Sequence, residues 1–125
     1  MKILLIDDDP SIRRAAELIL TRAGHETLSA ASGAQGLALA VSASPDAILL
    51  DWRLGAESGA EVCRRLKADE RTRGVPVLAL SAEKEPAALS EMISCGAAAV
   101  LSKPFSPAEL AGRVERALQR LRRDR

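Results

Sequence analysis

Six polar residues follow or end short apolar runs of the sequence. They are Asp7, Asp8, Asp9, Asp51, Ser81 and Lys103. Clustered carboxylates that lack histidine or cysteine neighbours suit a hard cation such as Mg²⁺, which prefers oxygen ligands. An aspartate can also attack phosphorus and become an aspartyl phosphate, whose charge a cation, an ammonium group and a hydroxyl would stabilise. This set of residues therefore indicates a site that places a phosphoryl group on one aspartate.

The apolar runs that deliver these residues are typical of buried strands. With one weaker run, they lie at 2–6, 25–30, 46–52, 75–81 and 98–102. Stretches with helical spacing alternate with them, from Pro10 to Gly24, Ser32 to about Ser42, Ser58 to about Ala68, Pro86 to Gly96, and Ser106 to about Leu121. We therefore expect an α/β domain with a doubly wound, five-stranded parallel sheet and five helices. Ligands bind such sheets beyond the carboxyl ends of the strands, where the six polar residues would meet.

Asp9 has a structural interpretation that separates it from its two acidic neighbours. It would cap the helix whose first residue is Pro10. A carboxylate at that position accepts hydrogen bonds from unpaired N–H groups and lies at the positive end of the helix dipole. Capping boxes are predicted at Ser32–Gln35, Ser58–Glu61 and Ser106–Glu109.

The composition indicates one ordinary domain of 125 residues with a net charge of +1. Residues 113–125 hold six arginines against two acids. We predict a domain over residues 1–121 and a basic tail or linker over 122–125. The tail is interpreted first as a solvated helix end, then as a linker to an output domain, and least of all as a nucleic-acid contact.

The two cysteines and the lengths of the apolar runs indicate the cellular compartment of the protein. Cys63 and Cys95 match no metal spacing and are interpreted as free thiols. No signal-peptide pattern is present, and no apolar run approaches the length that crosses a bilayer. A cytoplasmic protein without a membrane partner is therefore expected.

Four motifs resemble those of bacterial response-regulator receiver domains, and the resemblance covers essentially the whole chain. The motifs are IDDDP, LLDWRLGAESG, LSA and GAAAVLSKPF. Asp51 and Ser81 lie 30 residues apart and Ser81 and Lys103 lie 22 apart, which are both usual spacings for the family. The resemblance implies a flavodoxin-like three-layer sandwich with strand order 2-1-3-4-5.

The resemblance also implies the role of each acid. Asp51 would accept the phosphoryl group from a sensor histidine kinase or a phosphotransfer protein. Mg²⁺, with Mn²⁺ as an alternative, would be bound by Asp8, Asp51 and the main-chain carbonyl of Arg53. Asp7 would bind the ion mostly through water. The domain would be a signalling switch that promotes only its own phosphorylation and dephosphorylation, and so not an enzyme with an external substrate.

Further roles follow from the same resemblance. Ser81 and Lys103 would bind the phosphoryl oxygens, and the bond from Lys103 to Pro104 would be cis. The residues that flank the pocket would be Trp52, Arg53, Ala82 and Glu83. We predict that Arg53 and Glu83 pair across the pocket mouth and hinder the water that hydrolyses the acyl phosphate.

Two positions depart from the family pattern. Val100 stands where receivers often carry a tyrosine or phenylalanine, so rotation of an aromatic ring cannot be the signal of this protein. Gly55 stands where a proline is common, which should loosen the loop after Asp51. A homodimer could form through the helix from Pro86, the strand 98–102 and the last helix; the downstream protein target is not indicated.

Two other classes of function remain open at this stage. A phosphohydrolase of the haloacid-dehalogenase type also uses a strand-end aspartate, but it needs a second aspartate two residues later, where Arg53 stands. An interaction module that never needs phosphate is the other alternative, and Val100 is the feature that supports it.

Overall fold

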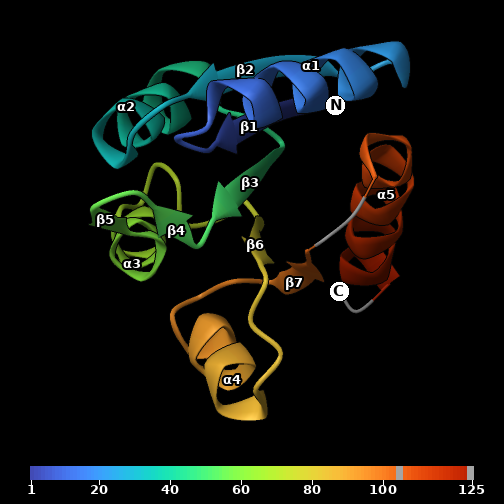
Figure 1. Cartoon of the computed structure of the whole chain (residues 1–125). Coiled ribbons are helices and arrows are strands. Elements are labelled where there is room, and N and C mark those ends of the chain that lie inside the picture. The colour runs from blue at the N-terminus through green and yellow to red at the C-terminus, as the bar shows by residue number, and fades with distance from the viewer. Residues whose placement is uncertain (104–105, 124–125) are drawn as a thin grey trace.

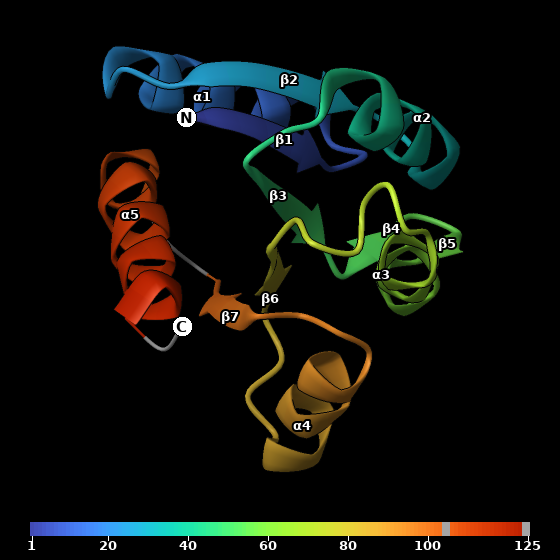
Figure 2. The same cartoon turned by 180° about the vertical axis from the view of Figure 1, so that it is seen from behind.

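The computed structural model describes residues 1–103 and 106–123, and its centre is a parallel sheet of five strands (Figure 1). The strands are β1 (Lys2–Ile6), β2 (Glu26–Ala30), β3 (Ala47–Asp51), β6 (Val77–Ser81) and β7 (Ala99–Ser102). Their order in the sheet is β2-β1-β3-β6-β7, with β2 and β7 at the edges (Figure 2). The predicted order 2-1-3-4-5 is thereby confirmed.

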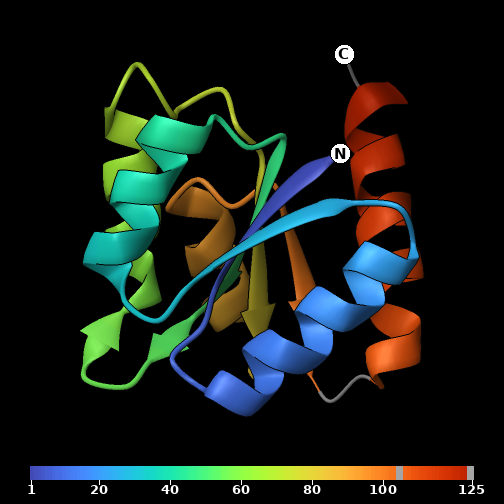
Figure 3. The same cartoon turned by 90° about the horizontal axis from the view of Figure 1, so that it is seen from above.

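Five helices cover the two faces of this sheet. They are α1 (Pro10–Arg22), α2 (Gly33–Ala43), α3 (Gly59–Ala68), α4 (Pro86–Ser94) and α5 (Pro107–Arg123). In the view from above, α1 and α5 lie on one side of the strands, and α2, α3 and α4 lie on the other (Figure 3). The predicted three-layer α/β sandwich is therefore the fold of this chain.

The alternation of side chains along each strand produces two separate cores. Ile3 and Leu5 of β1 pack on the side of α1 and α5, together with Val114. Leu4 and Ile6 of β1 point to the opposite face and pack in the cluster that contains residues of α2 and α3. Along β1 both faces of the sheet are buried, because each side chain from Ile3 to Ile6 is at most 1% exposed. A sheet buried on both faces is held firmly in register, which fixes the positions of the strand ends.

The predicted cap residues of α1, α2 and α3 are confirmed, but the capping boxes predicted at Ser32 and Ser58 lack their return hydrogen bond among the described residues. Asp9 Oδ1 accepts a hydrogen bond from Ser11 N at 2.9 Å and caps α1. Ser32 and Ser58 cap α2 and α3 through their hydroxyl groups. At α2 the Gln35 side chain accepts from the N–H of Ala31 and not from that of the cap residue. At α3 the Glu61 carboxylate accepts from Arg65 instead.

One element was not predicted from sequence. The segment after Asp51 forms an antiparallel hairpin of β4 (Arg53–Leu54) and β5 (Glu57–Ser58). Two-residue strands are too short to show an alternating pattern, so this hairpin has no periodic signal. Gly55 begins its turn with a φ of +62°, a left-handed conformation that glycine adopts without strain.

Several boundaries differ from the predicted ones by a few residues. The strand predicted from residue 75 begins at Val77, since Pro76 has no N–H to donate to a neighbouring strand. Helix α5 continues to Arg123, two residues beyond the predicted end at Leu121. No helix in the part of the chain that the structure describes is long and apolar enough to span a bilayer.

An acidic site at the carboxyl ends of the strands

The carboxyl ends of β1, β3, β6 and β7 bring the predicted site residues to one edge of the sheet. In Figure 3 this is the lower edge, to which the arrowheads of β6 and β7 point. Asp7 and Asp8 follow β1 directly, Asp51 is the last residue of β3, and Ser81 is the last residue of β6. The register pairs Ser81 with Ser102, so Lys103 follows β7 at the same level. Tertiary structure therefore brings these five residues to the same edge of the sheet.

Asp51 and Lys103 are in direct contact. The Nζ atom of Lys103 lies 3.2 Å from Oδ1 of Asp51, and the backbone N–H of Arg53 donates to the same oxygen at 3.2 Å. Asp51 is only 7% exposed, so water screens this ion pair poorly. The main chain reinforces the arrangement, because Lys103 N donates to the carbonyl oxygen of Ser81 at 2.8 Å. A carboxylate oxygen of Asp51 is thus held against the ammonium group of Lys103 at the edge of the sheet.

Two further carboxylates converge on Asp51 beside this pair. One carboxylate oxygen from each of Asp7, Asp8 and Asp51 lies within 4.8 Å of the others. Asp8 is exposed, whereas Asp7 is completely buried. Like charges at this separation repel each other, and a divalent cation bound between them would remove the repulsion.

Asp7 provides an independent test of whether a cation fits. Its Oδ1 accepts a hydrogen bond from Asp9 N at 2.9 Å, but its Oδ2 is buried without a hydrogen-bond partner among the described residues. Burial raises the pKa of Asp7 above its ordinary value, and the negative charge of Asp51 adds to the rise. A buried oxygen without a partner is costly, and Mg²⁺ with its water ligands is the kind of group that would satisfy it. The acidic cluster therefore fits a hard divalent cation.

The residues predicted to flank the pocket lie in the segments that follow β3 and β6. Nη2 of Arg53 and Oε1 of Glu83 form an ion pair at 3.0 Å, which links the loop after β3 to the loop after β6. Ala82 is exposed beside it, and Trp52 is half-buried against the core. Ser81 is buried, and its Oγ accepts a hydrogen bond from Glu83 N at 3.0 Å.

Two further predicted positions have different outcomes. Val100 is partly buried and packs against a small cluster that contains Ala79 of β6 and Met92 of α4. Pro104, for which a cis bond was predicted, lies outside the described residues.

Sequence reasoning missed the role of Gly59, the first residue of α3. Its N–H donates to the carbonyl oxygen of Trp52 at 3.1 Å, and a Cβ atom added there would lie 2.8 Å from the carbonyl oxygen of Asp51. Helix α3 can therefore approach the segment that bears Asp51 only because residue 59 has no side chain. The glycine directly after the Ser58 cap was the available signal.

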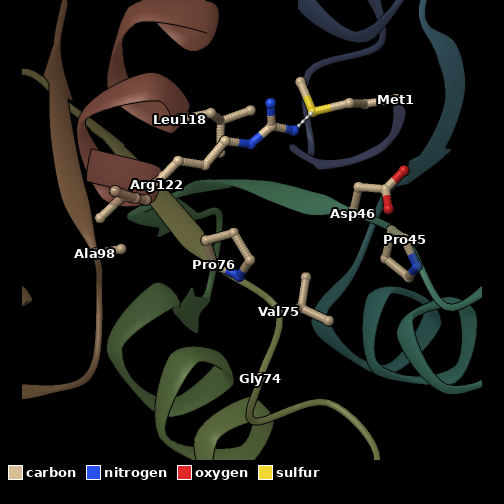
Figure 4. A pocket seen from close by; sticks show the side chains of 10 residues that line it. Met1, Pro45, Asp46, Gly74, Val75, Pro76, Ala98, Leu118 and Arg122 are labelled. Carbon is tan, nitrogen blue, oxygen red and sulfur yellow. Dashed lines mark hydrogen bonds between the residues drawn. The ribbon is translucent and has the colours of Figure 1, made fainter. Parts of the chain in front are cut away.

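A hollow at the opposite end of the sheet contains none of the predicted site residues. It has a volume of about 610 Å³, and its walls include Met1, Val75, Pro76, Leu118 and Arg122 (Figure 4). Ligands of parallel α/β sheets bind at the carboxyl ends of the strands. The acidic site is therefore the candidate functional site.

The fold and this site define a class of protein, and comparison with known families agrees. The response regulator receiver domain matches residues 3–115, and the chain belongs to this family. It is 42% identical over 118 residues to the phosphate regulon transcriptional regulatory protein PhoB of Pseudomonas aeruginosa. That match covers 94% of this chain and 52% of PhoB. The chain spans about half the length of the curated relatives that it matches.

Other relatives support the same assignment. The DNA-binding response regulator MtrA of Mycolicibacterium smegmatis is 36% identical over 119 residues, which are 95% of this chain and 51% of MtrA. Among solved structures, the chemotaxis response regulator CheY4 of Vibrio cholerae aligns with a TM-score of 0.87 at 33% identity. That alignment covers 93% of this chain and 97% of CheY4. The predicted family is confirmed, and neither the phosphohydrolase nor the phosphate-independent module is favoured.

Proposed function

We propose that this receiver domain accepts a phosphoryl group on Asp51 from a phosphohistidine of a sensor kinase or phosphotransfer protein. The observation that supports this most directly is the contact between Lys103 Nζ and Asp51 Oδ1 beside the carboxylates of Asp7 and Asp8. A cation on one side and a binding place for a divalent ion on the other are what phosphoryl transfer to a carboxylate requires.

The hydrogen bonds of Asp51 indicate which oxygen attacks. Both the Lys103 ammonium and the Arg53 N–H bind Oδ1, while Oδ2 accepts no hydrogen bond from the described residues. An Oδ2 lone pair would form the new P–O bond as the P–N bond to the donor imidazole breaks. The electron pair of that bond returns to the imidazole nitrogen. Lys103 would meanwhile hold the carboxylate in position.

Mg²⁺, with Mn²⁺ as an alternative, would be held by the side chains of Asp8 and Asp51 and the main-chain carbonyl of Arg53. Asp7 would bind it mostly through water. The ion would neutralise charge on the transferred oxygens. The fit rests on the acidic cluster and on the buried Oδ2 of Asp7.

After transfer, the phosphoryl group adds about −1.5 to −2 charges at neutral pH. Ser81 is placed to respond, because its Oγ accepts from Glu83 N and its own hydroxyl proton can turn toward a phosphoryl oxygen. Lys103 would pair with the new charge from the other side. Since Val100 has no ring to rotate, movement of β6 would reach α4 through the packing of Ala79, Met92 and Val100.

The proposal also includes a surface for dimerisation and the limits of the domain. A homodimer through α4, β7 and α5 would use the exposed Ile93 of α4, which is 51% exposed. Residues 1–121 would form the receiver domain, and residues 122–125 would be a basic tail or linker. Light scattering with and without a phosphodonor would test the dimer.

The decisive experiment is the intact mass of the protein after incubation with a small phosphodonor and Mg²⁺. Wild type should gain the mass of one phosphoryl group, and Asp51→Asn should gain none. Asp9→Asn is the matched control, because it removes the same charge from a residue that caps α1. Equal uptake by Asp51→Asn and wild type would contradict the proposal, as would no uptake by wild type.

A further inference from the structure

Arg13 of α1 reaches back to the acidic segment. Its Nη1 donates a hydrogen bond to the carbonyl oxygen of Asp7 at 2.7 Å. Arg13 lies in the first turn of α1, where its own N–H donates to the carbonyl of the cap residue Asp9. Its side chain is partly buried, while that of the next residue, Arg14, is exposed. The first turn of α1 therefore contacts the main chain at the point where β1 ends.

Among the described residues, three hydrogen bonds hold Asp7, and each uses a different part of the residue. Its N–H donates to the carbonyl of Ala30 in β2, its Oδ1 accepts from Asp9 N, and its carbonyl accepts from Arg13. Only the bond from Arg13 comes from a side chain. The remaining oxygen, Oδ2, is buried without a partner among the described residues and lies in the acidic cluster.

We propose that Arg13 is a positioning residue for divalent-cation binding. By holding the Asp7 carbonyl, it fixes the peptide that joins Asp7 to Asp8, and so the directions of both carboxylates. This inference rests on the proposed function, since it assumes that the acidic cluster binds Mg²⁺. It adds a residue outside the cluster whose effect is exerted through the main chain.

The charge of Arg13 has the opposite effect on cation binding. A guanidinium group near the cluster repels a divalent cation, so its removal would tighten binding if charge were all that mattered. Loss of the hydrogen bond would instead free the Asp7–Asp8 peptide and add an ordering cost to binding. The two interpretations therefore predict changes of opposite sign in the Mg²⁺ dissociation constant.

The experiment compares Arg13→Met with Arg14→Met. Both variants lose one positive charge from neighbouring positions of the same helix turn, but only the first loses the bond to Asp7. The Mg²⁺ dissociation constant is measured on the unphosphorylated protein by the fluorescence of Trp52, the only tryptophan of the chain, and by titration calorimetry. We expect Arg13→Met to bind Mg²⁺ roughly three- to tenfold more weakly, which matches the net contribution of one hydrogen bond. Arg14→Met should bind it equally or slightly more tightly.

A dissociation constant for Arg13→Met that equals or falls below that of Arg14→Met would overturn the proposal. If Arg13→Met fails to fold, Arg13→Gln decides in the same way against Arg14→Gln. A failure of the proposed function itself is seen separately, because wild type would then bind no Mg²⁺ or Asp8→Asn would bind it as tightly as wild type.

Discussion

At the scale of single residues, Asp7 is the group of the site whose burial most lowers the stability of the folded protein. Its side chain is completely buried, and one of its oxygens has no partner among the described residues. Without a divalent ion, Asp7→Asn should therefore stabilise the protein by about 1–2 kcal/mol near neutral pH, because it removes a buried charge of like sign to Asp51. The measurement is urea unfolding in the presence of a chelator. A lower stability for the variant would contradict the claim that the charged Asp7 side chain destabilises the folded protein.

Because of Asp7, the stability of the protein should depend on pH. Burial raises the pKa of Asp7 in the folded protein above the ordinary value of 3.8. Protonation therefore favours the folded state, and this contribution is complete below pH 3.8 and lost as the pH rises through the raised pKa. The advantage of Asp7→Asn over wild type should consequently grow as the pH rises through that window. The measurement is urea unfolding of both proteins at a series of pH values. A stability difference that does not change with pH would contradict the prediction.

The ion pair between Arg53 and Glu83 belongs to the same scale. The Arg53 side chain is 84% exposed, so the pair adds little to stability. If it hinders the attacking water, Glu83→Ala should speed loss of the phosphoryl group by up to about fivefold, since an exposed pair is worth up to about 1 kcal/mol. The rate is followed by mass after the phosphodonor is removed. Glu91→Ala on α4 is the control, and equal rates for the two variants would refute the hypothesis.

At the scale of elements, the close approach of α3 to β3 depends on a glycine. A Cβ on residue 59 would lie 2.6 Å from the Cα of Trp52 and 2.8 Å from the carbonyl oxygen of Asp51. Because backbone atoms cannot rotate away, Gly59→Ala should cost roughly 1–3 kcal/mol. It should also shift Trp52 fluorescence, since the segment that bears Asp51 must move. Gly74→Ala is the matched control, because nothing lies within 4 Å of its added Cβ. Equal stability of the two variants in urea would disprove the contact.

At the scale of the whole molecule, His25 joins parts of the chain that lie 90 residues apart. Its Nε2 is 3.1 Å from Oε1 of Glu115 on α5, and its Nδ1 is 3.3 Å from the amino group of Met1. The imidazole is only 9% exposed, whereas the Glu115 side chain is 45% exposed, so the contact is partly buried. A double-mutant cycle of His25→Ala and Glu115→Ala should give a coupling free energy of about 0.5–1.5 kcal/mol. Additive effects in urea unfolding would show that the contact between His25 and Glu115 does not help to hold α5.

Much of this molecule was predictable from sequence because the relevant signals are local. Apolar runs that alternate with helical periods predicted the five main strands and five helices, and Asp9 identified the start of α1. Parallel strands end at one edge of a sheet, so acids, a hydroxyl and a lysine after those strands had to meet there. The rules of crossover handedness then leave few topologies for such a chain. The sequence alone therefore determined the α/β fold class and which residues follow the strands, while the strand order was predicted from the resemblance to receiver domains.

Only the tertiary structure decided which atoms of the site face one another. It brings Nη1 of Arg13 to the carbonyl of Asp7, leaves Oδ2 of Asp7 without a partner among the described residues, and directs two donors to the same oxygen of Asp51. It also folds the loop after Asp51 into a hairpin of two-residue strands. Each of these features depends on rotamers and loop paths that are selected by packing against segments distant in sequence. Local periodicity carries no information about such contacts, because the same pattern of apolar residues is compatible with many arrangements of the polar side chains at the strand ends.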